Sequence, residues 1–178
     1  MGHIEREGII MQECLVLVKP TKEYADDAIR YREECLELDG EIDGAKEFAE
    51  VETYTDWLEC LKKKQNLIEG IPSSETYFVV CEGDDKVIGV VEIRPHTQLL
   101  QDNIGNISLS IRPCYRGEGY GRQAFALALE ACKKIGMRQV TIVCKEESIR
   151  MARLVSSNGG VENQEQQPRE YRRFYMSL

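Results

Sequence analysis

The sequence predicts a single α/β domain of the α+β type, with a mixed, mostly antiparallel sheet of six to seven strands flanked by about four helices. Its 178 residues, 42% hydrophobic and 30% charged, suit one hydrophobic core. Segments of strand and helix periodicity follow the order β-α-α-β-β-β-α-β-α-β. Three consecutive strands without an intervening helix favour antiparallel pairing. We expect one domain over residues 1–178, because no repeat or long linker divides the chain.

The first part of the chain is expected to hold one strand and two helices. Residues 14–18 form an apolar run that ends just before a Lys-Pro pair. Thr21 is a good N-cap for a helix over about residues 21–38, which an Asp-Gly pair ends. Apolar residues at spacings of three and four predict a second helix over residues 45–67, and residues 70–74 predict a loop.

The rest of the chain is expected to be mainly strands. Strands over residues 76–81 and 86–93 are joined by a Glu-Gly-Asp-Asp turn, which suits a hairpin. An amphipathic helix is expected over residues 119–135, and Gly136 follows it in the position where glycine ends helices. The other elements expected are strands over residues 106–111, 139–144 and 169–178, a helix over 147–157, and a short strand over 161–164.

The charge of the chain excludes some classes of partner. A net charge of -8 argues against nucleic-acid binding, which needs a basic surface. No apolar run is long enough to span a membrane, and residues 1–11 lack the basic start and apolar stretch of a signal peptide. We therefore expect a cytoplasmic protein with no nucleic-acid or membrane partner.

The charges are unevenly distributed along the chain. Residues 1–60 carry 17 acids and 6 bases, a net charge of -11, whereas residues 111–178 carry 7 acids and 12 bases, a net charge of +5. Two surfaces with different partners would explain this division, and so would two solvated helix faces.

The cysteines and histidines do not form a metal-binding pattern. The seven cysteines include no CxxC pair, and their apolar surroundings are typical of reduced thiols that pack as small hydrophobic residues. There are two histidines, far apart in the sequence. We expect no metal.

A glycine-rich segment between a strand and a helix is the most informative part of the sequence. Gly117, Gly119 and Gly121 stand at alternate positions, and Arg116 and Arg122 flank them. Glycines let backbone N–H groups approach a ligand, and the helix that follows adds unsatisfied donors, so a phosphate or pyrophosphate is the natural ligand. A plain turn is the alternative. The spacing does not match the dinucleotide fingerprint GxGxxG, and the P-loop pattern is absent.

Residues 116–121, Arg-Gly-Glu-Gly-Tyr-Gly, resemble the Arg/Gln-x-x-Gly-x-Gly/Ala signature of the GCN5-related N-acetyltransferase (GNAT) superfamily. The Ile-Arg-Pro sequence before the motif, the helix after it and the Asn-Gly-Gly sequence at residues 158–160 agree with this resemblance. More narrowly, residues 76–161 resemble a bacterial group of predicted acetyltransferases.

The resemblance implies that acetyl-CoA binds where two strands of the sheet splay apart, with no metal. An amine would attack the thioester directly in a ternary complex. The residues that it assigns to the cofactor are Ile111, Arg112, Pro113, Arg116, Gly117, Glu118, Gly119, Tyr120, Gly121, Arg122 and Ser148. Ser148 stands where the family often has an asparagine, and the alternative for it is a helix N-cap.

The catalytic residues are less well marked. Glu92 is the candidate for the base that removes a proton from the amine, with a solvent-facing strand residue as the alternative. Many members of the family protonate the departing thiolate with a tyrosine at the position of Val155. Tyr171 and Tyr175, on the last strand, are the candidates to replace it, with packing as the alternative.

Three functions stay open at this point. The first is transfer of an acetyl group from acetyl-CoA to a primary amine, the second a CoA-binding regulatory module without turnover, and the third a nucleotide-binding oxidoreductase. The acceptor expected for the first is a small or peptidic amine with positive charge, and a homodimer is left open. The site that binds this acceptor would have an acidic wall, formed by Glu34, Glu37, Asp39, Glu41 and Asp43.

Overall fold

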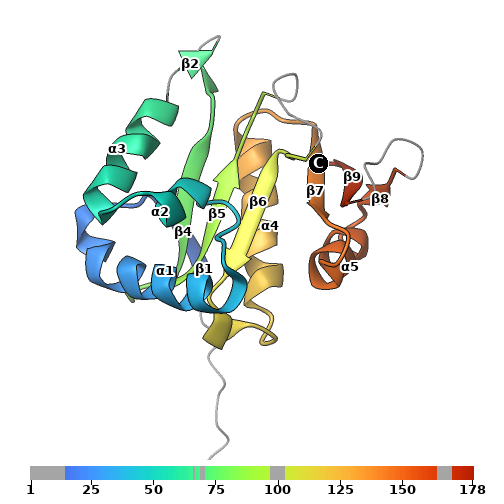
Figure 1. Cartoon of the computed structure of the whole chain (residues 1–178). Helices are drawn as coiled ribbons and strands as arrows, with labels where there is room; N and C mark the ends of the chain where they lie inside the picture. The colour runs from blue at the N-terminus through green and yellow to red at the C-terminus, as the bar shows by residue number, and fades with distance from the viewer. Residues whose placement is uncertain (1–14, 66, 69–70, 97–102, 164–169) are drawn as a thin grey trace, which may run out of the picture.

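The computed structural model describes residues 15–65, 67–68, 71–96, 103–163 and 170–178. A four-stranded antiparallel sheet has the strand order β1-β4-β5-β6 (Figure 1). Its strands are β1 (Leu15–Val18), β4 (Glu75–Cys81), β5 (Val87–Ile93) and β6 (Ile107–Ile111). A second antiparallel sheet, in the order β7-β9-β8, contains β7 (Gln139–Lys145), β9 (Tyr171–Ser177) and β8 (Val161–Glu162).

The two sheets are joined at one end and separate at the other. The Asn106 N–H, just before β6, donates to the Thr141 carbonyl at 2.6 Å, and the Thr141 N–H donates to Asn106 Oδ1 at 2.7 Å. A Cβ at Gly105 would lie 2.5 Å from the Thr141 oxygen, so glycine permits this close approach. Both strands lead away from this junction, and no ladder joins β6 to β7 beyond it. The two strands therefore splay apart toward their C-terminal ends.

Helices cover both faces of the four-stranded sheet (Figure 1). α1 (Ala25–Asp39), α2 (Lys46–Glu50) and α3 (Tyr54–Lys64) lie on one face, α4 (Tyr120–Lys134) lies on the other, and α5 (Ile149–Ser157) lies beside β7. Along β4 the side chains alternate between two buried clusters: Phe78 packs with Trp57, whereas Val79 packs with Phe125. This two-sided burial explains the continuous apolar run of the strand.

The predicted fold class is confirmed, with differences in the first part of the chain. The helix expected over residues 45–67 is two helices, because Val51 is extended and Thr53 starts α3 with a capping box to Asp56. A short hairpin, β2 (Leu67–Ile68) with β3 (Ile71–Pro72), stands where a helix end and a loop were expected. Thr21 precedes a 3₁₀ turn rather than α1, and its side chain makes no capping bond.

Two further observations concern earlier expectations. The six cysteines in the described part of the chain are free thiols, as expected. Four of them belong to, or pack against, the two buried hydrophobic clusters. Among the described residues, no helix has both the length and the apolar character needed to cross a membrane.

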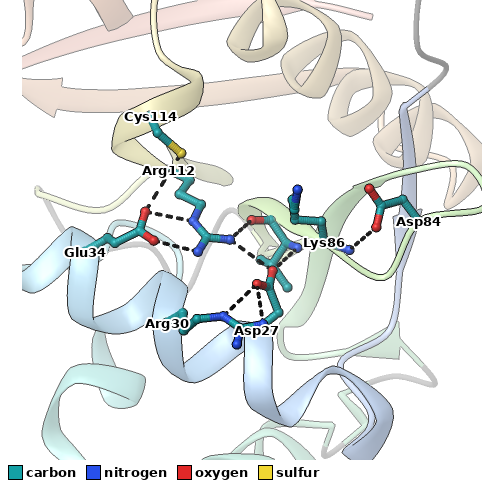
Figure 2. A network of polar contacts seen from close by, with 8 residues as sticks. Asp27, Arg30, Glu34, Asp84, Lys86, Arg112 and Cys114 are labelled. Atoms are coloured by element: carbon teal, nitrogen blue, oxygen red, sulfur yellow. Dashed lines mark hydrogen bonds and ion pairs between the residues drawn. The ribbon is translucent and has the colours of Figure 1, made fainter.

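Arg112 ties the end of β6 to α1 (Figure 2). Its side chain is 5% exposed, and its guanidinium donates to Glu34 through Nε at 2.8 Å and Nη2 at 2.6 Å. Nη1 also donates to Asp27 Oδ2 at 3.0 Å, and that oxygen accepts the Val87 N–H at 2.7 Å. One arginine thus joins a helix to two strands, and removing one partner of such a buried pair leaves the others uncompensated.

The two acids of this network have lowered pKa values. Hydrogen bonds from Arg112 hold the pKa of Glu34 below its ordinary value. Burial raises the pKa of Asp27, but the Val87 N–H and Arg112 outweigh this and leave that pKa below its ordinary value. Acids with a lower pKa in the folded state stabilise the fold above their unfolded pKa, and this stability is lost as the pH falls through the folded pKa.

We predict that Arg112→Met lowers the free energy of unfolding at pH 7 by about 3 kcal/mol, because Asp27 and Glu34 lose their buried partner. The matched control is Arg30→Met, which removes an exposed arginine from the same Asp27 and should cost less than about 1 kcal/mol. Urea unfolding at several pH values measures both. As the pH falls below about 4.5, the ordinary pKa of a glutamate, toward the lowered folded-state pKa values of Asp27 and Glu34, the gap between Arg112→Met and wild type should narrow progressively; a constant gap down to pH 3 contradicts the prediction.

Candidate functional site

Three adjoining hollows lie in the space between β6 and β7, and we call them together the splay cleft. Their volumes are about 560, 320 and 80 Å³, and all three are lined by Leu109 of β6 and Met151 of α5. The first hollow also faces the segment between α1 and α2, the second faces the glycine-rich loop, and the third lies toward the junction of the two sheets. The cleft is therefore a consequence of the strand separation.

The glycine-rich loop forms one end of the cleft. Gly117 and Gly119 have φ values of +90° and +89°, and a Cβ added at either would meet no atom within 4 Å. The space beside the loop is therefore open, although L side chains rarely adopt this backbone conformation. Gly119 is the N-cap of α4, and the N–H groups of residues 117–119 donate no hydrogen bond within the described parts of the chain. These N–H groups, with the helix N-terminus, suit an anion such as a phosphate.

The edge of β6 that faces the cleft is open. The Arg112 N–H donates to the Ile88 carbonyl and the Asn106 carbonyl accepts from the Arg94 N–H, so the even-numbered positions of β6 pair with β5. Alternation along an antiparallel strand then turns the N–H and C=O groups of Leu109 and Ile111 toward the splay. The Ile111 carbonyl accepts from Arg116 Nε at 2.7 Å, which agrees with this orientation. An extended ligand could pair with this edge as a strand does.

Two ion pairs cross the cleft. Arg116 of the glycine-rich loop donates to Asp39, at the end of α1, through both terminal nitrogens, one of them at 3.0 Å. Lys145, at the end of β7, pairs with Glu41. The hydrogen bonds from Arg116 lower the pKa of Asp39. Carboxylates at the end of α1 and just after it therefore pair with Arg116 and Lys145 in this structure.

Other cations at the cleft lack such partners. Arg122, in the first turn of α4, and Arg150, in the first turn of α5, both line the hollow beside the glycine-rich loop. Neither forms an ion pair with any residue that the structure describes. An anionic ligand at the loop would meet positive charge from two helices.

The structure brings most of the predicted cofactor contacts together. Ile111, Arg116, Gly117, Gly119, Gly121, Arg122 and Ser148 all line the splay cleft. Ser148 stands at the N-cap position of α5, but its side chain makes no capping bond, so its hydroxyl is available to the cleft.

Four of the predicted contacts are not among the residues that line the cleft. Arg112 is held by Glu34 and Asp27, Pro113 starts a 3₁₀ turn, Glu118 is exposed, and the ring of Tyr120 packs edge-on against that of Tyr115.

The candidate catalytic residues differ in their relation to the cleft. Tyr171, opposite Lys145 at the C-terminal end of β7, lines the third hollow, whereas Tyr175, opposite Thr141 at the junction, lines none of the hollows. Glu92 is also absent from the lining. It is 3% exposed rather than solvent-facing, and its carboxylate accepts from Lys64, Ser74 and Arg94.

Sequence reasoning missed several cleft residues. Leu109, Lys145, Arg150 and Met151 belong to no motif, and they meet at the cleft because β6, β7 and α5 converge there. The one signal that pointed to part of this set was the excess of bases in residues 111–178.

Comparisons with known proteins agree with this geometry. Residues 33–156 match the Acetyltransferase (GNAT) family. A search of curated protein sequences finds no match. Among solved structures, the chain is similar to RimL, a ribosomal L7/L12 alpha-N-protein acetyltransferase in complex with coenzyme A, at 11% identity and TM-score 0.66 over 92% of this chain and 94% of that one.

Two other structures show the same fold. The Microcin C7 self immunity acetyltransferase MccE, in complex with acetyl-CoA and AMP, has 14% identity and TM-score 0.65 over 94% of this chain and 92% of its own. The spermidine/spermine N-acetyltransferase SpeG from Vibrio cholerae has 17% identity and TM-score 0.62 over 92% of this chain and 93% of its own. The splayed strands, the glycine-rich loop and the match over more than half of the sequence lead to one conclusion: the chain belongs to the GNAT acetyltransferase family.

Proposed function

We propose that the protein transfers an acetyl group from acetyl-CoA to a primary amine by direct attack in a ternary complex. The observation that carries the proposal is the open space beside Gly117 and Gly119 at the N-terminus of α4, because backbone N–H groups at a helix N-terminus that face open space suit a pyrophosphate. When bound, acetyl-CoA supplies a thioester that is activated toward amines.

The residues of the cleft suit the pyrophosphate and the pantetheine arm of such a cofactor. The N–H groups of residues 117–119 and the guanidinium of Arg116 would bind the pyrophosphate, and Arg122 and Arg150 would add charge at the mouth of the cleft. The open edge at Leu109 and Ile111 would pair with the amide groups of the pantetheine arm. Arg116 would then exchange its contact with Asp39 for one with phosphate.

We assign the two proton transfers, from the substrate ammonium and to the leaving thiolate, to residues that line the cleft. We propose Asp43 rather than Glu92 as the group that takes the proton from the substrate ammonium, because Asp43 lines the first and third hollows. Although Asp43 is exposed, desolvation by the surrounding residues raises its pKa and the nearby charge of Glu41 raises it further, which brings this carboxylate closer to the range of a general base. Tyr171 is the candidate that protonates the leaving thiolate, because its side chain borders the third hollow.

The acidic wall of the cleft favours an acceptor with positive charge. Of the five acids expected in this wall, Asp39, Glu41 and Asp43 line the first hollow, whereas Glu34 is held by Arg112 and Glu37 is not in the lining. Arg116 and Lys145 hold two of the three lining acids, and an anionic cofactor that binds those cations leaves carboxylates to attract a cation. SpeG, which shares the fold, is a spermidine/spermine acetyltransferase. The cytoplasmic location stays a prediction, and the homodimer stays an open alternative.

A CoA-binding module without turnover is the second candidate. The observation that favours it is Val155, which is fully buried in the core where many members of the family carry a tyrosine. Turnover distinguishes the two functions.

We predict that Gly119→Val abolishes acetyl-CoA binding, because its side chain would occupy the space beside the loop and strain a backbone with φ +89°. Gly136→Val is the matched control, since Gly136 has φ +87° with equally open surroundings at the other end of α4. Calorimetric titration with acetyl-CoA measures both variants. Equal affinity of the folded Gly119→Val protein and the control would refute the site.

We predict that Tyr171→Phe lowers kcat by about tenfold to a hundredfold with little change in the KM for acetyl-CoA, because it removes a proton donor and leaves the ring in place. Tyr175→Phe serves as the control: Tyr175 lies on the same face of β9 but does not line the cleft. Steady-state kinetics of thiol release separate the two variants. Equal kcat values for both would exclude Tyr171 as the donor.

We predict a thermal shift with CoA and acetyl-CoA but not with NAD, and thiol release with amines. Cationic amines should exceed neutral amines in kcat/KM by at least several-fold, and added salt should shrink this gap because it screens the acidic wall. A shift with NAD alone would favour an oxidoreductase. CoA binding without thiol release for any amine would favour the binding module, and equal kcat/KM values at all ionic strengths would show that the acidic wall does not select the acceptor.

A further inference from the structure

A second cavity lies at the opposite edge of the four-stranded sheet from the splay cleft, and we call it the edge cavity. It has a volume of about 350 Å³ and is formed by the segment after β1, the C-terminal half of α3 and the start of β4. Four lysines, Lys19, Lys22, Lys62 and Lys64, line it together with Leu58 and Leu61. This volume is within the range of small-molecule sites.

The lining of the edge cavity is basic although the chain as a whole is acidic. None of its described lining residues is a carboxylate, although acids outside the lining pair with two of the lysines: Glu75 with Lys19, and both Glu47 and Glu92 with Lys64. Lys22 forms no ion pair with the described residues, and Lys62 pairs with Glu59 at the surface, where both side chains are more than half exposed. Exposed pairs of this kind are weak, so these two ammonium groups are available to an anion.

The floor of the edge cavity contains an unused hydroxyl. Thr76 of β4 is 6% exposed and lines the cavity, but its side chain has no hydrogen-bond partner among the described residues. The hydroxyl oxygen is not fully enclosed by protein atoms, so it can be reached from the cavity. A ligand with a hydrogen-bond acceptor would supply a partner, and Leu58 and Leu61 would contact an apolar portion of that ligand.

A buried chain of polar contacts leads from the edge cavity to the splay cleft. Lys64, in the lining, donates to Glu92 Oε1 at 3.1 Å, and Glu92 Oε2 accepts from Arg94. Arg94 Nη1 in turn donates to Ser108 Oγ at 3.0 Å, and Ser108 lines the third hollow of the cleft. Thr76, Glu92 and Ser108 are also directly paired across β4, β5 and β6.

We propose that the edge cavity binds a small organic anion, a carboxylate or phosphate with a short apolar body, and that its occupancy changes the affinity of the splay cleft for its ligand. Lys22 and Lys62 hold the anion, and Thr76 donates to it. The anion attracts Lys64 away from Glu92, and Arg94 and Ser108 adjust in turn. The binding site stands independently of the proposed function, whereas the coupling rests on it.

Calorimetry with hexanoate tests the binding site, with hexanamide as the uncharged probe and inorganic phosphate as the probe without an apolar body. Hexanoate should bind, hexanamide should not, and phosphate should bind more weakly. The double variant Lys22→Ala/Lys62→Ala should weaken hexanoate binding at least tenfold, and Thr76→Val should weaken it by less.

Two controls place the anion. Arg122→Ala/Arg150→Ala removes two cations from the splay cleft, and Lys133→Ala/Lys134→Ala removes two lysines from the end of α4; both should bind hexanoate as wild type does. The proposed site would be overturned if hexanoate did not bind or if hexanamide bound equally well. It would also be overturned if the Arg122→Ala/Arg150→Ala variant alone lost hexanoate binding.

The coupling is measured by titrating CoA with and without saturating hexanoate. The two dissociation constants should differ by about fivefold or more in wild type, and CoA should change the affinity for hexanoate by the same factor. Glu92→Gln and Ser108→Ala each break the polar chain and should remove the difference; Ser108→Ala is the milder change should Glu92→Gln fail to fold. Hexanoate binding with no effect on CoA would overturn the coupling. Failure of CoA to bind at all would refute the proposed function, while the hexanoate titration would still decide the edge cavity.

Discussion

The junction between Asn106 and Thr141 is the constraint on which the cleft depends. Two hydrogen bonds hold the starts of β6 and β7 together, and Gly105 permits the approach because a Cβ there would collide with the Thr141 carbonyl. Since the strands meet there and diverge beyond it, the outer edge of β6 pairs with no strand at Leu109 and Ile111, and the Ile111 carbonyl accepts a hydrogen bond from Arg116 instead. An unpaired strand edge inside a fold is a polar surface that requires a partner. The same separation that creates the cavity therefore also supplies its hydrogen-bonding groups.

The electrostatics of the cleft follow from the way in which distant segments meet. The acidic end of α1 faces the basic loop before α4, and the structure satisfies both by pairing Asp39 with Arg116 and Glu41 with Lys145. Such partly exposed pairs are weakly stabilising, so an anionic ligand with several phosphate oxygens can replace the carboxylates. By contrast, Arg112 is buried between Glu34 and Asp27, where exchange would leave charges without partners. Of these two neighbouring arginines, Arg112 is therefore fixed within the fold, whereas Arg116 can exchange its partner for a ligand.

Expectations from the sequence succeeded where local patterns decide the structure. The strand alternation, the amphipathic period of α4 and the glycine at its C-terminus depend on neighbours within a few residues, so their boundaries were close. The break between α2 and α3 was missed because the apolar spacing continues through it, while the capping box at Thr53 starts a new helix. For Glu92, alternation along the strand offered a solvent-facing position as the alternative to a catalytic base, and this alternative failed for a related reason: Lys64, Ser74 and Arg94 come from three other places in the chain to contact its buried carboxylate.

By itself, the sequence determined the fold class, the glycine-rich loop and the division of charge, because each is a property of consecutive residues. The tertiary structure decided which side chains share a site. Arg116 and Arg112 lie four residues apart, yet only the packing of α1 shows that one lines the cleft and the other is buried. Tyr171 and Tyr175 likewise lie on the same face of β9. Tyr171 lines the cleft and Tyr175 does not, because Tyr171 is at the end of β9 where the two sheets splay apart. The physical reason is that a cleft is formed by surfaces from distant segments, whose meeting depends on long-range packing rather than on local preference.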